Sequence, residues 1–343
     1  MKKSGIGLIL LCMFLLTGCV SKEAKETYAN GVQALEEKNY ETAADEFQKL
    51  VDMGEKLPEA YRGLGIAELN MARYAEASIA FSKALLNMET DNTKFEKDVK
   101  SYLALARARR GEYTEAAEVY TELLRLEESP EYYYLRGKCY LAMEDMEKAK
   151  CDFDMAAANS TDCKLFIGIY QAYNNLQMNA DGSAYLEQAL ELVAEDEYYN
   201  RGLIHYYLQD YTKAKESLIQ AIKTTNETDA MLLLGKVYLS MGDVANARAM
   251  YQEHVGEEDF AAEAYNGLAL CDMAEGNYDT ALIHIQEGLN YEDQDVQQSL
   301  LFNEICAYEY LNDWDNARAK AAEYITKYPT DEVGAKENEF LTH

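Results

Sequence analysis

Residues 61–85, YRGLGIAELNMARYAEASIAFSKAL, contain two short amphipathic segments that follow each other directly. Each segment carries apolar or small residues three, four or seven positions apart, namely Tyr61, Leu64 and Gly65 in the first and Ala77, Phe81 and Ala84 in the second. Such spacings put each set on one face of an α-helix. A hairpin of two helices this short cannot bury its apolar faces alone, so the fold needs neighbouring hairpins of the same kind.

The rest of the chain supplies these neighbours by repeating the pattern. We number one period so that Tyr61 is position 4, Gly65 position 8, Ala77 position 20 and Phe81 position 24. Nine copies of the pattern occur, and successive copies are 32 to 39 residues apart. Position 20 is occupied by Ala43, Ala77, Ala116, Ala149, Gly182, Ala214, Ala247, Ala281 and Ala317. The fifth copy is degenerate, because Gly182 replaces the usual alanine.

The pattern resembles the tetratricopeptide repeat, whose signature uses these positions. The resemblance implies an all-α fold, a right-handed α-solenoid of about nine helical hairpins over residues 24–331, with a capping helix in residues 330–343. The longest interval, 39 residues, predicts a longer helix or loop near residues 87–98.

Polar residues at fixed positions predict where the helices begin. Position 16 is Asp or Asn in six copies, which predicts N-caps for the second helices at Asn39, Asp145, Asp210, Asp243, Asn277 and Asp313. Position 2 is acidic in six copies, which suits the positive end of the first helices, and these residues are Glu59, Asp98, Glu131, Asp196, Asp229 and Glu263.

The N-terminal residues read as an export signal. Residues 1–18 begin with Lys2 and Lys3 and continue with an apolar run that is too short to span a bilayer. The four residues 16–19, LTGC, resemble the lipobox of bacterial lipoproteins. That resemblance implies that Cys19 is lipidated on its thiol and becomes the mature N-terminus, with residues 19–27 as a short linker. The alternative is an ordinary signal peptide.

Charge and motifs argue against several classes of function. The formal net charge of −29 argues against binding a nucleic-acid backbone and permits attraction to basic partners. The cysteines after Cys19 form no C-x-x-C pair, and the histidines share no ligand spacing. We therefore expect no metal, no cofactor and no enzyme activity. Cys139, Cys271, His205 and His254 fall beside or on packing positions and are expected to be buried.

The remaining face of each first helix is the candidate binding surface. At 100° per residue, positions 4, 7, 8 and 11 lie opposite positions 2, 5, 9, 12 and 13. The family resemblance implies that the second set lines a concave groove for extended peptides or partner helices. The candidate residues are Tyr28, Arg62, Tyr134, Lys138, Gln171, Asn174, Tyr199, Lys236, Asn266 and Phe302. In residues 61–85, Ile66, Leu69 and Asn70 are also expected to face this groove.

Tyrosine offers a large contact area with one hydrogen-bonding group, which suits peptide recognition. The alternative is that several tyrosines only pack between adjacent repeats. The paired lysines and asparagines by which chaperone-binding members of the family hold a carboxylate are not reproduced here.

These patterns favour a membrane-tethered scaffold or adaptor on the extracytoplasmic side of a bacterial cell membrane. Its partners would be envelope proteins or peptide segments, basic ones included. A solute- or glycan-binding lipoprotein is the alternative, although the single tryptophan, Trp314, falls on a packing position and sugars usually need exposed aromatic rings.

Overall fold

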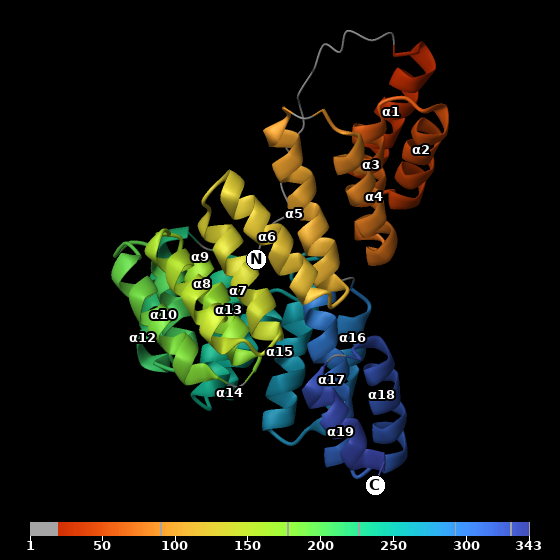
Figure 1. The fold of residues 1–343 in the computed structure, drawn as a ribbon. Helices are drawn as coiled ribbons and strands as arrows, with labels where there is room; N and C mark the ends of the chain where they lie inside the picture. The colour runs from red at the N-terminus through yellow and green to blue at the C-terminus, as the bar shows by residue number, and fades with distance from the viewer. Residues whose placement is uncertain are drawn as a thin grey trace. The chain divides into compact units, whose positions relative to one another are not determined.

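The computed structural model describes residues 20–89, 91–176, 178–225, 227–291, 293–329 and 331–342. The expected signal segment, residues 1–18, and the expected lipidation site, Cys19, lie outside the described residues. Within this part the chain forms nineteen α-helices and no strand, which confirms the all-α class and the solenoid of helical hairpins (Figure 1).

The helices alternate between the first and the second helix of each repeat. The first helices are α1 (Lys22–Glu36), α3 (Leu57–Asn70), α5 (Thr93–Arg109), α7 (Pro130–Ala142), α9 (Cys163–Asn174), α11 (Tyr198–Tyr207), α13 (Thr228–Ser240), α15 (Ala261–Ala274) and α17 (Gln294–Tyr310). The second helices are α2 (Tyr40–Met53), α4 (Tyr74–Asn87), α6 (Tyr113–Leu126), α8 (Met146–Ala158), α10 (Asn179–Leu192), α12 (Tyr211–Thr225), α14 (Val244–Gln252), α16 (Tyr278–Leu289) and α18 (Trp314–Lys327). A final helix, α19 (Glu332–Thr342), packs against α18.

The chain divides into two compact units, and the division falls between Ala189 and Leu190. This point lies inside α10, the second helix of the repeat in which Gly182 replaces alanine. Within each unit, consecutive first helices contact each other, as α1, α3 and α5 do in the first unit and α13, α15 and α17 do in the second.

The repeat-defining residues form the core. The eight alanines at position 20 have no exposed surface. Phe47 and Tyr251, both at position 24, each lie between two glycines of consecutive first helices. A Cβ atom added at Gly63 would lie 2.4 Å from the Phe47 ring, and one at Gly267 would lie 2.4 Å from the Tyr251 ring. Glycine is therefore required at these positions by the close approach of an aromatic ring.

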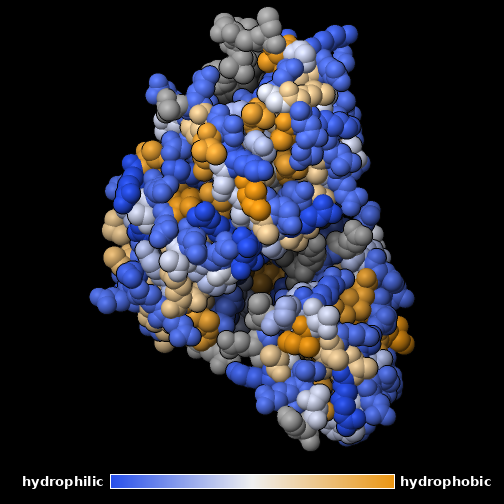
Figure 2. Space-filling view, turned by 45° about the vertical axis from the view of Figure 1, so that its right-hand side comes forward, coloured by the Kyte–Doolittle hydropathy of each residue, from blue (hydrophilic) through white to orange (hydrophobic). Residues whose placement is uncertain are grey.

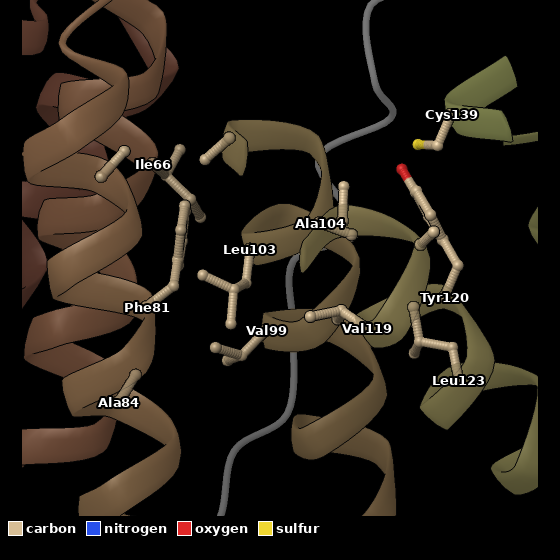
Figure 3. Packing of buried hydrophobic residues seen from close by; sticks show 14 residues of the cluster. Ile66, Phe81, Ala84, Val99, Leu103, Ala104, Val119, Tyr120, Leu123 and Cys139 are labelled. Carbon is tan, nitrogen blue, oxygen red and sulfur yellow. The ribbon is translucent and has the colours of Figure 1, made fainter. Parts of the chain in front are cut away.

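The packing between neighbouring repeats is visible in the cluster around Phe81. Phe81 and Ala84 of α4 face Val99 and Leu103 of α5 (Figure 3). Burial of a Phe, Val or Leu side chain of this kind contributes about 1.5–3 kcal/mol. Ile66 belongs to this cluster and is only 5% exposed, so the prediction that it faces a groove was wrong. The reason is that α5 packs against α3 and covers this position.

The turn inside each hairpin uses the same backbone conformation. Position 15 has a positive φ in eight repeats, at Lys38, Ala72, Gly111, Glu144, Gln209, Gly242, Gly276 and Asn312. The equivalent residue of the fifth repeat, Gln177, lies outside the described residues. The left-handed residue ends the first helix and redirects the chain into the second.

Most of the predicted helix ends are confirmed. The side chains of Asn39, Asp145, Asp210, Asp243 and Asp313 accept hydrogen bonds of 3.2–3.3 Å from backbone N–H groups three residues ahead. Asn277 is also the N-cap residue of its helix, α16, but its side chain accepts no such bond, and its Nδ2 donates to Glu275 Oε2 at 3.3 Å. The longer element predicted near residues 87–98 is α5, which has 17 residues.

Candidate partner-binding surface

The first helices carry the candidate binding residues, and we call the surface formed by their positions 2, 5, 9, 12 and 13 the first-helix face. Polar contacts link neighbouring first helices across this face. Ser101 on α5 lies 3.3 Å from the Tyr132 hydroxyl on α7, and Asn303 on α17 donates to Asn266 on α15 at 2.8 Å. These contacts hold the helices in a fixed order, so a partner would meet a preformed surface.

In the first unit, Tyr28 and Arg62 are engaged within the protein. The Tyr28 ring packs edge-on against Phe47, with ring centroids 6.0 Å apart, and Lys56 Nζ lies 4.3 Å from its centroid. Arg62 binds both carboxylate oxygens of Asp98, and its Nη2 is 3.0 Å from Oδ1. Burial alone would lower the pKa of Arg62, but the hydrogen bonds to Asp98 outweigh it and raise the pKa.

The other candidates in this unit lie on α7 and α9. The Tyr134 hydroxyl packs against the backbone of Gly168, where an added Cβ would lie 2.8 Å away. Lys138 Nζ is 5.4 Å from the centroid of the Tyr134 ring, and the Lys138 side chain is exposed. Gln171 and Asn174 are exposed on α9. Of the ten candidates on first helices, Lys138 and these two amides therefore present the most open polar surface.

The second unit holds four candidates, and all are partly covered. Tyr199 packs against the cluster around Leu218. Lys236 donates to Glu263 at 2.6 Å, and Asn266 accepts from Asn303. The Phe302 ring packs edge-on against Tyr324 at 5.8 Å and against the C-terminal core cluster. Packing between repeats, the alternative interpretation of the aromatic residues, accounts for most of the contacts of Tyr199 and Phe302.

The ion pairs reveal a role for position 2 that the sequence patterns did not suggest. Asp98 and Glu263 both occupy position 2, where we expected them only to suit a helix N-terminus. Each instead neutralises a cation on the preceding first helix, Arg62 or Lys236. Burial alone would lower the pKa of Lys236, but the charge of Glu263 and its hydrogen bond more than offset this and raise it. The sequence did contain a signal for these ion pairs, namely a cation at position 5 or 9 of one repeat and an acid at position 2 of the next repeat.

The expected buried residues are confirmed. Cys139 and Cys271 are 3% and 0% exposed, and burial raises the pKa of each thiol to about 11. His205 and His254 are 5% and 3% exposed. Burial lowers the pKa of His205, which favours its neutral form. These thiols and imidazoles therefore serve as core residues.

The first unit also has a pocket outside the first-helix face. A shallow pocket of about 360 Å³ between α4 and α5 is lined by Ser78, Ile79, Ser82, Lys83, Leu86, Arg107, Arg110 and Glu112. The described residues contain no group of three or more His, Cys, Asp or Glu side chains arranged to hold a metal ion. None of the described helices is long and apolar enough to cross a bilayer. The face shown in Figure 2 is mostly hydrophilic, with small separate hydrophobic patches.

Two curated proteins are similar to parts of this chain. Tetratricopeptide repeat protein 37 of Xenopus laevis is 24% identical over 277 residues, which cover 74% of this chain and 17% of that protein. BBSome complex member BBS4 of Bos taurus is 28% identical over 94 residues, which cover 27% of this chain and 18% of that protein. The chain thus spans less than a fifth of the length of either relative.

Solved structures show a similar fold. A tetratricopeptide repeat protein from Parabacteroides merdae has a TM-score of 0.50 and 15% identity, covering 72% of this chain and 99% of that chain. Yeast Tom70 has a TM-score of 0.50 and 13% identity, covering 89% of this chain and 85% of that chain. At these identities the likeness concerns the fold alone.

Two family models match repeats of this chain. A model described as Tetratricopeptide repeat matches residues 103–161, 199–259 and 232–295, and a second model with the same description matches residues 300–331. Together these matches include more than half of the chain, and they agree with the buried alanines and paired helices of the structure. The chain belongs to the tetratricopeptide repeat family.

Proposed function

We propose that this protein is a lipid-anchored scaffold that holds partner proteins at the extracytoplasmic face of a bacterial membrane. The repeat family itself implies a protein–protein interaction scaffold. The anchor rests on the sequence of residues 1–19, where a basic start, an apolar run and LTGC precede the repeats. Two or more acyl chains at Cys19 would give a stable attachment, since each buried methylene contributes about 0.8 kcal/mol.

One observation carries the choice of the first-helix face as the binding surface. In the first unit, Lys138, Gln171 and Asn174 project from consecutive first helices and are exposed. The residues that define the repeats, such as Ala149 and Phe153, are completely buried. Because buried residues of this kind hold the repeats together, the exposed side chains of the first-helix face can present a polar surface to a partner.

The proposed mechanism is binding and spatial organisation without chemical turnover. The cysteine thiols at 139, 271 and 306 have pKa values raised to about 11 by burial, which suits packing and makes them poor nucleophiles. The partners would be other envelope proteins, held close to the membrane because α1, the first helix of the first repeat, begins at Lys22, three residues after Cys19.

Site-specific photo-crosslinking in living cells tests the binding surface. A benzoylphenylalanine residue at Asn174 should crosslink a defined partner, which mass spectrometry then identifies. The matched control places the same residue at Ile79, which is 57% exposed on the second helix α4. Equal crosslinking from both sites, or crosslinking from Ile79 alone, would contradict the assignment to the first-helix face.

Membrane fractionation tests the anchor separately. Cys19→Ala should move the protein from the detergent-soluble membrane fraction to the aqueous fraction, because the thiol that would carry the lipid is gone. Cys151→Ala, which removes an exposed thiol within α8, is the control and should leave the distribution unchanged. Retention of the Cys19→Ala protein in the membrane fraction would rule out this anchor.

A further inference from the structure

We infer that the first-helix face of α5, α7 and α9 recognises an acidic segment of its partner through Arg109 and Lys138. This inference rests on the proposed function and names the chemistry of the partner that the face would take. It runs against the net charge of the chain, which by itself favours basic partners.

Four other cations on first helices of this unit are neutralised within the protein. In the first unit, Arg62 pairs with Asp98, Lys97 with Glu127, Lys100 with Glu96 and Glu122, and Arg136 with Asp152. Arg109 and Lys138 differ, because no described carboxylate lies within ion-pair distance of either one. Both are exposed, and they come from first helices of consecutive repeats.

The repeat numbering explains why Lys138 lacks a carboxylate. Lys138 and Lys236 occupy the same position, position 9, in the fourth and seventh repeats. Lys236 is neutralised by Glu263, at position 2 of the following repeat. Position 2 of the repeat that follows Lys138 is occupied by Lys164, the second residue of α9, which is exposed and carries a positive charge like Lys138. The substitution of a base for an acid leaves Lys138 without its internal partner.

The electrostatic environments of the two lysines differ accordingly. Partial desolvation by neighbouring atoms and the charge of Arg109 lower the pKa of Lys138, whereas Glu263 raises the pKa of Lys236. The positive charge of Arg109 disfavours the charged form of Lys138, and a carboxylate bound beside both cations would relieve this repulsion. The absence of a neighbouring acid thus favours an anionic ligand at this place.

The surroundings of the cations fit a peptide. The Tyr134 ring lies beside Lys138 and packs over Gly168, so it offers a fixed aromatic surface next to the charges. Asn174 on α9 presents an exposed amide, which can bind the backbone of an extended chain. An Asp or Glu side chain flanked by an apolar residue would meet Arg109, Lys138 and Tyr134 together.

An unbiased peptide selection provides the first test. The full chain, kept in a non-ionic detergent, is used to select from a phage library of random dodecapeptides fused through their C-termini. We expect the selected peptides to be enriched in Asp and Glu, and the enrichment to vanish with the Arg109→Ala/Lys138→Ala double variant. Enrichment in Lys or Arg, or the same peptides from both proteins, would overturn the inference.

Affinity measurements then locate the contact. The best acidic peptide and its version with Glu changed to Gln are labelled with fluorescein and titrated by anisotropy. Arg109→Ala and Lys138→Ala should each weaken the acidic peptide about three- to tenfold and leave the neutral peptide nearly unchanged. Arg125→Ala, which removes an exposed cation at the end of α6, is the matched control and should have no effect.

Further arms separate other anions from an acidic side chain. Equal displacement of the peptide by inorganic phosphate and by free peptide would indicate a general small-anion site and contradict peptide recognition. Binding that requires a free C-terminus and is lost on amidation would assign the site to a chain end instead of to side chains. If Asn174 still crosslinks its partner in the Arg109→Ala/Lys138→Ala variant, the acidic-segment inference fails while the proposed scaffold function stands.

Discussion

One acidic side chain of the C-terminal helix lies beside an acidic side chain of the last repeat. This pair predicts that the stability of the protein depends on pH. Glu309 on α17 interacts with Glu337 on α19, and this interaction favours the protonated form of Glu309, because a protonated carboxyl group can donate a hydrogen bond to Glu337 whereas two carboxylates would repel each other. Burial, this hydrogen bond and the charge of Glu337 raise the pKa of Glu309 from 4.5 to about 7. Among the described residues, no donor reaches the buried Oε1 of Glu309.

The sign of the effect follows from the raised pKa. The folded protein holds the proton more tightly than the unfolded chain, so the stabilisation is fully present below pH 4.5 and is lost as the pH rises through about 7. A fully shielded group with this change in pKa would lose about 3 kcal/mol. Both carboxyl groups are partly exposed, and solvent screening reduces the expected loss to about 1–2 kcal/mol.

Glu309→Gln removes the titration, because an amide stays neutral and can donate to Glu337 at every pH. At pH 8 the variant should therefore be more stable than the parent by about 1–2 kcal/mol, and at pH 4.5 the two should be equal. The measurements are urea unfolding and native-state hydrogen exchange of α19 across this pH range. Glu339→Gln changes an exposed acid on the same helix and is the control. Parallel stability curves for Glu309→Gln and the parent would refute the shared proton.

Three further substitutions test the packing of the repeats. Gly63→Ala should destabilise the protein by about 1–2 kcal/mol despite better helix propensity, because its Cβ would lie 2.4 Å from Phe47; combination with Phe47→Leu should recover part of this loss in chemical denaturation. Ala72→Gly should raise the melting temperature, since glycine removes about 1 kcal/mol of strain at φ 57°. Phe81→Ala should cost about 3–5 kcal/mol in urea unfolding, and a loss below 1 kcal/mol would contradict the burial of Phe81.

Much of the fold could be predicted from residue spacing because every hairpin packs its two helices through the same positions of the repeat. Alanine at position 20 is small enough for two helices to cross, and each such alanine is completely buried. The N-caps could be predicted because a short polar side chain at position 16 needs only the backbone of its own helix. Asn277 takes the predicted N-cap position of α16 without a capping side-chain bond, and its amide donates to the neighbouring acid Glu275. Local patterns therefore predict local structure well until a neighbour competes.

The candidate binding surface could be predicted less completely, because its exposure depends on contacts between repeats. The helical angle of Ile66 placed it on the outer face, yet the neighbouring helix α5 covers it. Arg62 and Lys236 also have the predicted angle, but their charges are taken up by Asp98 and Glu263. A single-helix projection contains no information about the next helix. Pairs of positions in consecutive repeats must be compared to find which side chains remain available.

This comparison suggests how a repeat protein can change its partner without changing its fold. The acids at position 2 that form these pairs, Asp98 and Glu263, are partly exposed and are not among the buried residues of the core, so their replacement should leave the core intact. Loss of such an acid nevertheless leaves the cation on the preceding first helix without a counterion. Lys236 has its acid, Glu263, whereas Lys138 has Lys164 at the equivalent position. Binding specificity would then be set by which repeats omit their internal counterion. In this chain the fifth repeat does so, because Lys164 replaces the acid, and a partner acid would complete there the ion pair that other consecutive repeats make with each other.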